Sequence, residues 1–303
     1  MPNLRDIKKR INSVQSTKQI TRTMEMVATA KIRHASSRVQ AATPYARSMY
    51  ETLATLSEDQ SLSSNPLLAK HDEVKHIVLI AVTSDRGLAG GFNSYVLRAV
   101  DQFVVERQKN GVEVELIACG KKAIAYFNYR GYHMALKYAA LSADPTIAQA
   151  REIASFVSDM YTSGKTDQVF IYYNHARNSA DQDLTFEEVL PVEPSETDVA
   201  LQESKENAES MTEKLMGDFE FEPSAAEVLD ALLPAYVENR IYHALIDSAA
   251  GEQGARRKAM KSATDNATDM VNTLTRSYNR ARQGAITTEL NEIVGGASAL
   301  EDE

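Results

Sequence analysis

Apolar residues at both ends of this chain recur at alternating spacings of three and four. Polar Lys18, Thr21 and Glu25 continue the N-terminal register, and Ser277 continues the C-terminal one. A mean spacing of 3.5 residues is typical of a helix that supercoils against another helix. Because each terminal helix needs a partner, the simplest arrangement pairs them as a coiled-coil shaft, which suggests a mechanical role. The apolar positions are Leu4, Ile7, Ile11, Val14, Ala28, Ile32, Ala35, Val39, Ala42, Ala46, Met49, Leu53, Leu56, Met260, Ala263, Ala267, Met270, Leu274 and Ala281.

The N-terminal helix is too long to lie wholly inside a compact domain. Residues 1–64 contain no glycine, and Pro44 is the proline expected to kink the pattern. About 55 helical residues would span ~80 Å. Part of the helix must therefore project or be covered by other chains, and Ser57–Pro66 is expected to be the exit loop.

Composition excludes several classes of protein. The 303 residues allow one domain with a long extension, or two small domains. No apolar run approaches the ~18 residues of a membrane-spanning helix. The single cysteine, Cys119, excludes an internal disulfide and favours a reducing compartment.

Charge is distributed unevenly along the chain. Residues 1–40 hold nine Lys or Arg against two acids, whereas residues 181–230 hold sixteen acids against two lysines. A basic helix in an acidic chain favours an acidic partner, which could be a protein, a nucleic acid or a membrane surface. The alternative is a solvated helix face. Although this N-terminus has the composition of a transit peptide, its register continues that of the following helix, so we expect it in the mature protein.

The middle of the chain alternates strands and helices. This order predicts a mainly parallel, doubly wound sheet. Asp144 is expected to cap the last of these helices, with Pro145 in its first turn. The predicted strands are Val74–Val82, Val112–Ala118, Tyr132–Tyr138 and Gln168–Tyr173, and the predicted helices are Phe92–Gln108, Lys121–Asn128 and 144–163.

The predicted organisation has four parts. Residues 1–64 form the N-terminal coiled-coil helix, and residues 65–192 form a Rossmann-like α/β domain in which Asp183–Val192 adds an extended segment. Residues 193–223 are an acidic variable segment, in which Val199–Met216 is either a surface helix or a mobile loop. Residues 224–303 form the C-terminal coiled-coil helix.

A glycine-rich turn, Ser84–Gly91, follows the first predicted strand and precedes a helix. Phosphate loops lie at such places, because free N–H groups at a helix start attract anions. The turn lacks the Gly-Lys-Ser/Thr of a P-loop and the G-x-G-x-x-G of a dinucleotide site. A tight turn that needs positive φ is therefore favoured. The six histidines have no metal-ligand spacing, and no catalytic set is recognisable, so neither a cofactor nor a metal is expected.

Several long motifs carry a family resemblance. INSVQSTKQITRTMEMVATAK at 11–31 resembles the N-terminal signature of the gamma subunit of F-type ATP synthase. Ser84–Asn93 resembles that family's Asp-Arg-Gly-Leu-x-Gly-Gly turn. MKSATDN at 260–266, NRARQ at 279–283 and ITTELNEIV at 286–294 resemble its C-terminal signature.

The resemblance implies a non-catalytic central rotary stalk. The terminal helices would form an antiparallel coiled coil inside a ring of alpha and beta subunits. The C-terminal tip would lie in an apolar sleeve, and the Rossmann-like domain would bind the epsilon subunit and the membrane c-ring. Proton flow would turn the stalk, and the stalk would change nucleotide affinity at the beta sites. No nucleic acid and no directly bound nucleotide are implied. The location would be the cytoplasmic face of a bacterial inner membrane, as a peripheral protein.

The resemblance also assigns residues. Arg282 and Gln283 match the pair that contacts a beta-subunit loop, and Lys18, Arg22 and Met24 match the turn that faces an acidic lever of beta. In the turn, Asp85, Arg86 and Gly87 would face beta or epsilon.

Some features depart from the family pattern. Ala89 stands where many members have a small thiol residue, and the acidic segment 193–218 looks long for the family and contains no cysteine. A thiol switch is therefore not expected. Two other functions compete: a nucleotide-dependent enzyme, which needs a phosphate loop, and a coiled-coil scaffold or nucleic-acid binder, which predicts salt-sensitive DNA binding.

Overall fold

The computed structural model describes residues 4–57, 65–71, 73–193 and 222–301. The chain forms two compact units, one of Met1–Val27 with Arg257–Glu303 and one of Ala28–Arg256. Both terminal helices contribute residues to each unit. The predicted four-part division stays a prediction, since most of its acidic segment, with the possible helix 199–216, lies outside the described residues.

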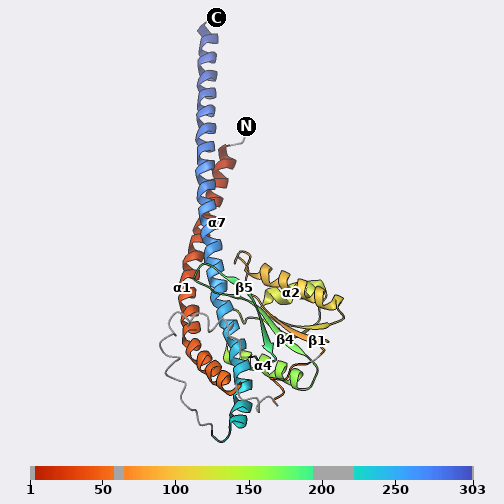
Figure 1. Cartoon of the computed structure of the whole chain (residues 1–303). Helices are drawn as coiled ribbons and strands as arrows, with labels where there is room; N and C mark the ends of the chain where they lie inside the picture. Colours follow the sequence, from red (N-terminus) through yellow and green to blue (C-terminus); the bar gives the residue numbers. More distant parts are fainter. Residues whose placement is uncertain (1–3, 58–64, 72, 194–221, 302–303) are drawn as a thin grey trace. The chain divides into compact units, whose positions relative to one another are not determined.

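Two very long helices confirm the prediction that both ends of the chain are helical (Figure 1). α1 spans Leu4–Ser57 and keeps Pro44 inside it, and α7 spans Ala225–Glu301. In the unit of Met1–Val27 and Arg257–Glu303, the start of α1 and the end of α7 point the same way, so the two helices run antiparallel. No described helix has the length and apolar character that a membrane crossing requires.

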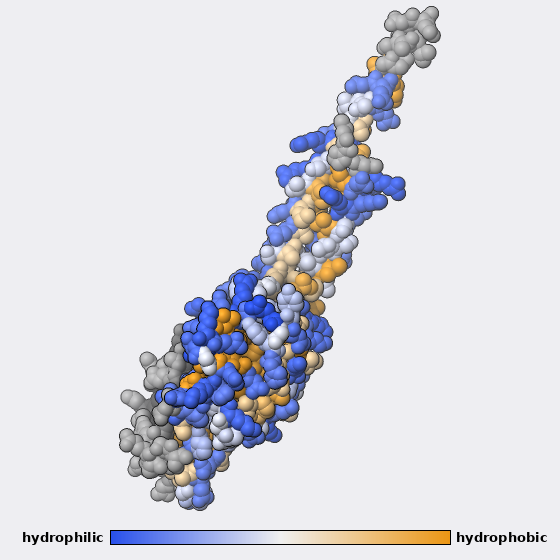
Figure 2. Space-filling model, turned by 90° about the vertical axis from the view of Figure 1, so that its right-hand side faces the viewer, coloured by the Kyte–Doolittle hydropathy of each residue, from blue (hydrophilic) through white to orange (hydrophobic). Residues whose placement is uncertain are grey.

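Several of the predicted positions in this unit lie in the seam between the helices, whereas Met270, predicted in the same register, is 54% exposed. Ile7, Met260 and Ala267 are buried there. Thr21, a polar residue in the apolar register, is also buried, and its hydroxyl lies 2.8 Å from the hydroxyl of Thr264. A small hydroxyl thus fits the seam because its partner helix supplies a hydrogen bond. Figure 2 shows hydrophobic residues along this two-helix part with hydrophilic ones beside them.

The other unit contains a five-stranded sheet, as predicted. Its order is β3-β2-β1-β4-β5. β1, β2, β3 and β4 are parallel, and β5 pairs antiparallel with β4. The strands are β1 (His76–Val82), β2 (Glu113–Cys119), β3 (Met134–Tyr138), β4 (Gln168–His175) and β5 (Asp183–Leu190).

Helices cover both faces of this sheet, because alternate residues of each central strand point to opposite sides. Ile77 and Leu79 of β1 pack with α2 (Phe92–Lys109) and α3 (Lys121–Arg130). Val78 and Ile80 pack with α4 (Ile147–Thr162), α1 and α7 in the larger cluster. The sheet is therefore doubly wound, and the terminal helices form part of its core.

One predicted helix start was wrong. α4 begins at Ile147, and Thr146, not Asp144, is its N-cap residue. The Thr146 hydroxyl accepts a hydrogen bond from the Gln149 N–H, and the Gln149 side chain accepts one from the Thr146 N–H, which completes a capping box. The Asp144 carboxylate instead forms an ion pair with Arg38 of α1.

Candidate partner-binding surfaces

The glycine-rich turn after β1 contains a carboxylate, that of Asp85, which accepts several hydrogen bonds. The Asp85 carboxylate accepts hydrogen bonds from the backbone N–H groups of Lys121 (2.9 Å), Ala140 (2.9 Å) and Ser142 (3.1 Å), and from the Ser142 hydroxyl (3.0 Å). Lys121 is the first residue of α3. A carboxylate therefore fills the anion-attracting start of α3, whereas the helix that follows the glycine-rich turn itself is α2.

The charge state of Asp85 follows from these contacts. Partial burial alone would raise the pKa of its carboxyl group, but the three backbone donors and the Ser142 hydroxyl outweigh burial and lower the pKa below its usual range. Asp85 is therefore ionised under all ordinary conditions. Its negative charge disfavours a second anion at the same place.

The rest of the turn presents one face to solvent and one to α7. Arg86 is exposed, and Leu88 is 62% exposed with a positive φ of 64°. The Gly87 carbonyl accepts a hydrogen bond of 3.3 Å from Arg256 of α7. Of the predicted residues here, Arg86 is thus available to a partner, whereas Asp85 and Gly87 take part in internal contacts.

The shaft residues do not form one site. On α1, Arg22 is exposed while Lys18 and Met24 are half-buried. On α7, Arg282 and Gln283 are exposed. Arg282 lies 18 positions beyond Thr264, which pairs with Thr21, so roughly 27 Å of helix separate the two groups. They are two surfaces at different levels of the shaft.

α7 carries a further apolar stripe toward its end. Residues 282–294 are all exposed. Among them Ile286, Leu290 and Ile293, spaced by four and three, are 48%, 55% and 63% exposed, and they share one helix face. In the described residues nothing in this chain covers that face, so the stripe is a candidate contact surface.

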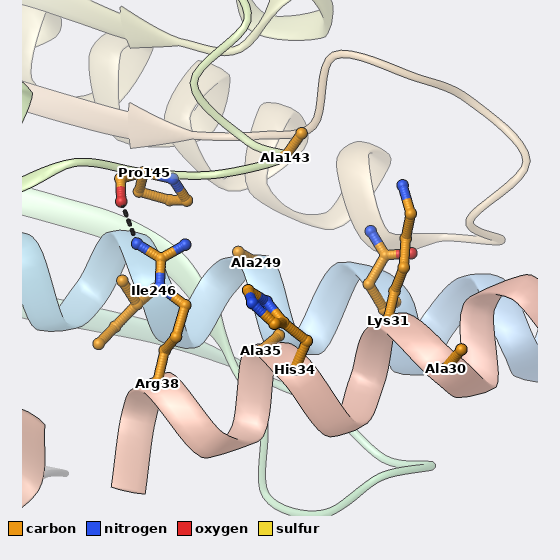
Figure 3. A pocket seen from close by; sticks show the side chains of 10 residues that line it. Ala30, Lys31, His34, Ala35, Arg38, Ala143, Pro145, Ile246 and Ala249 are labelled. Atoms are coloured by element: carbon orange, nitrogen blue, oxygen red, sulfur yellow. Dashed lines mark hydrogen bonds between the residues drawn. The ribbon is translucent and has the colours of Figure 1, made fainter. Parts of the chain in front are cut away.

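A cavity lined by basic residues lies between α1 and α7. The sequence had indicated only that the N-terminal helix is basic as a whole. It has a volume of about 260 Å³, and Lys31, His34 and Arg38 of α1 line one side (Figure 3). Ile246 and Ala249 of α7 form an apolar part of its wall. Arg38 is held by Asp144 and by the Pro145 carbonyl. The spacing of three and four between the basic residues, which places them on one helix face, was the signal available in the sequence.

The comparisons with known proteins agree on one family. The ATP synthase family profile matches residues 3–300. The ATP synthase gamma chain of Pelotomaculum thermopropionicum is 43% identical over 301 residues, 99% of this chain and all of the relative. The gamma chain of Chlorobium phaeobacteroides is 40% identical over 305 residues, 99% of both. The chain therefore belongs to the ATP synthase gamma chain family, as its motifs predicted.

Solved structures share the fold. A chain of the Euglena gracilis mitochondrial ATP synthase in a structure of OSCP, F1 and c-ring is 20% identical with a TM-score of 0.63, over 98% of this chain and 94% of that one. A chain in the central stalk and c-ring structure from Tetrahymena thermophila is 23% identical with a TM-score of 0.57, over 80% of this chain and 99% of that one. The predicted combination of terminal helices and α/β domain is thereby confirmed.

Proposed function

We propose that this chain is the central stalk subunit of an ATP synthase. It would couple proton flow through a membrane rotor to ATP synthesis or hydrolysis on other subunits. The observation that carries this proposal is the bare end of α7, where residues 282–294 extend as an exposed helix with an apolar stripe. Such a stripe is stabilised only when a surrounding apolar surface covers it. A sleeve formed by alpha and beta subunits would do so.

The chain itself would be non-catalytic. The Asp85 carboxylate, which belongs to the glycine-rich turn, occupies the start of α3, and its negative charge disfavours a nucleotide phosphate beside it. Among the described residues no group of His, Cys, Asp or Glu is arranged to hold a metal ion. These observations favour a subunit that binds no nucleotide directly, and they weaken the alternative of a nucleotide-dependent enzyme.

Two contacts with the catalytic subunits are proposed from the family motifs. Arg282 and Gln283 would hydrogen-bond to a loop of beta, since both side chains are exposed on the bare part of α7. Lys18, Arg22 and Met24 would face an acidic segment of beta. The Lys31, His34 and Arg38 cavity extends the basic character of α1, which supports an acidic partner along this helix.

The remaining partners follow from the same role. We place the α/β domain against an epsilon subunit and a membrane c-ring, with exposed Arg86 among the contacts. Nucleic acid is not proposed as a partner. The protein would be peripheral, on the cytoplasmic face of a bacterial inner membrane.

Co-expression with alpha and beta subunits from the same source tests the proposal. We expect this chain to co-purify at one copy per complex and ATP hydrolysis to be strong only in its presence. The matched variant Arg282→Ala with Gln283→Ala should lower hydrolysis, whereas Tyr129→Phe, at an 88% exposed position, should not. If alpha and beta do not bind the chain, a coiled-coil scaffold becomes the better explanation.

A further inference from the structure

One segment of α7 is buried on nearly every side although much of it is polar. Residues 243–256 are all buried or half-buried. Asp247, Glu252 and Arg256 are only 2%, 3% and 8% exposed. A helix with charged residues normally turns them to solvent. Burying these charges has a cost unless each is paired, so their contacts indicate what this segment does.

The first contact holds α7 to the end of β4. The Asp247 carboxylate lies 2.7 Å from Nδ1 of His175 and accepts a hydrogen bond of 3.1 Å from the Ala176 N–H. Two glycines on the same side of α7 allow the β4–β5 loop to approach. A Cβ at Gly251 would lie 3.1 Å from the Asn174 carbonyl oxygen, and one at Gly254 would lie 2.7 Å from the Gln182 amide nitrogen.

The second contact holds α7 to the turn after β1. Arg256 donates to the Gly87 carbonyl at 3.3 Å and forms an ion pair of 2.6 Å with Glu252, one turn earlier. Ala255 packs with Ala89 of the same turn and with Phe92, the first residue of α2. The segment predicted as a tight turn with positive φ has such residues, Leu88 and Gly90, and it also contacts α7.

The loops that follow β1 and β4 lie at the topological switch point of the sheet. β1 and β4 are neighbours, and the order of the strands reverses between them. In open α/β sheets, ligands bind in the crevice at the carboxyl ends of two such strands. Here the loops that follow β1 and β4 contact a helix of the same chain. We call the segments 84–92 and 174–182 the α7 collar.

The collar holds α7 from opposite sides. Asp247 and Arg256 are nine residues apart, which is about 2.5 turns, so their side chains leave opposite sides of the helix. Ile246 and Ala250 pack against Val39, so α1 contacts a further side of α7. A helix held from several sides cannot turn about its own axis unless directional hydrogen bonds break.

We infer that the α7 collar is the joint through which torque passes between the shaft helix and the α/β domain, with Asp247 and Arg256 as its positioning residues. This inference rests on the proposed function. Apolar contacts alone are non-directional and would resist axial slippage weakly. Buried ion pairs and hydrogen bonds fix one orientation. The close backbone approaches at Gly251 and Gly254 interlock the helix with the loop.

The test compares two activities of the complete membrane complex in inverted vesicles. ATP hydrolysis reports the shaft within the catalytic subunits, and ATP-driven proton pumping needs torque to reach the membrane rotor. In Asp247→Ala and Arg256→Gln we expect pumping per ATP hydrolysed to fall about twofold or more. Asp247→Asn keeps an acceptor for the Ala176 N–H, so it should lie between Asp247→Ala and the wild type.

The control is Asp101→Ala. Asp101, on α2, has two partners of its own in the α/β domain, Arg130 and Tyr132, and neither belongs to the collar. It should pump protons at the wild-type ratio.

A purely structural role would reduce the amount of assembled complex, so that both activities fall in proportion. The inference would be wrong if assembled variants of Asp247 and Arg256 pumped at the wild-type ratio. It would also be wrong if they lost both activities equally. A wild-type complex that does not couple would instead overturn the proposed function.

Discussion

α7 passes through two opposite environments within one helix. Residues 243–256 are enclosed and carry buried ions, whereas residues 282–294 are exposed and carry apolar side chains. In each segment some side chains differ from what the surroundings within this chain favour, the buried ions in the first and the exposed apolar stripe in the second. The enclosed segment resolves the conflict internally, through His175 and the Gly87 carbonyl. For the bare segment, covering surfaces must come from other subunits.

The difference between the two segments shows which part of α7 is fixed by this chain and which part is not. The collar fixes α7 to its own domain, so changes there should alter the mechanical connection within the chain. The bare end contributes no buried side chain among the described residues, so we expect folding not to depend on it.

Removing residues 285–303 should have the largest effect on function and little effect on folding. We expect coupling between ATP hydrolysis and proton pumping to fall more than about tenfold, because a whole contact surface is lost. The melting curve of the isolated chain, followed by circular dichroism, should change little. Removing only residues 301–303 is the control, and it should leave coupling intact. Loss of the fold on truncation would show that the end of α7 is structural.

Shortening one isoleucine in each region should give unequal losses of stability. Ile80 is fully buried in the sheet, so Ile80→Ala should lower the free energy of unfolding by about 2–5 kcal/mol. Ile293 is 63% exposed, so Ile293→Ala should change it by less than about 0.5 kcal/mol. Urea titrations of the two isolated variants measure both values. Equal losses would show that residues near Ile293 are packed in the isolated chain.

The sequence was sufficient for the elements with strong periodicity. The alternation of strands and helices predicted the parallel sheet, and a register of 3.5 predicted α1 and α7. The start of α4 was missed because three consecutive residues, Asp144, Pro145 and Thr146, all suit a helix start. The ion pair between Asp144 and Arg38, which are 106 residues apart, decided among them. Local pattern contains no information about such a partner.

The candidate sites divide in the same way. Arg282, Gln283 and Arg22 were predicted as exposed partner contacts from motifs, and their exposure is compatible with that role. The collar was not predicted, because it depends on which residues meet across the sheet edge. Asp247 and His175 are 72 residues apart and neither belongs to a recognised motif. In the sequence, the only available signal was that charged residues such as Asp247 interrupt the apolar pattern of the C-terminal helix.

Gly120→Ala should have an intermediate effect on stability. Gly120 links β2 to α3 with φ of 98°, and a Cβ there would lie 2.2 Å from the Thr83 carbonyl oxygen. Both the backbone strain and the clash oppose a side chain, so we expect a loss of about 2–4 kcal/mol in urea unfolding. Gly131→Ala is the matched control, since Gly131 also has positive φ but no atom within 4 Å of its Cβ position. A loss at Gly120 no larger than at Gly131 would show that the turn relaxes.

Asp85→Asn should lower stability less than Gly120→Ala, and the loss should depend on pH. The pKa of Asp85 is lowered in the folded chain, so its hydrogen bonds contribute stability that is fully present above the usual carboxyl pKa near 3.8 and lost as pH falls through the folded value. At pH 7 the variant should be less stable by about 1 kcal/mol, comparable to a lost helix cap. The difference between Asp85→Asn and the wild type should shrink below pH 4, because protonation neutralises the carboxylate in the wild type as well. Urea unfolding between pH 3 and 7, with Tyr129→Phe as control, measures it. A difference independent of pH would mean that the shape of the side chain, and not its charge, holds the turn against α3.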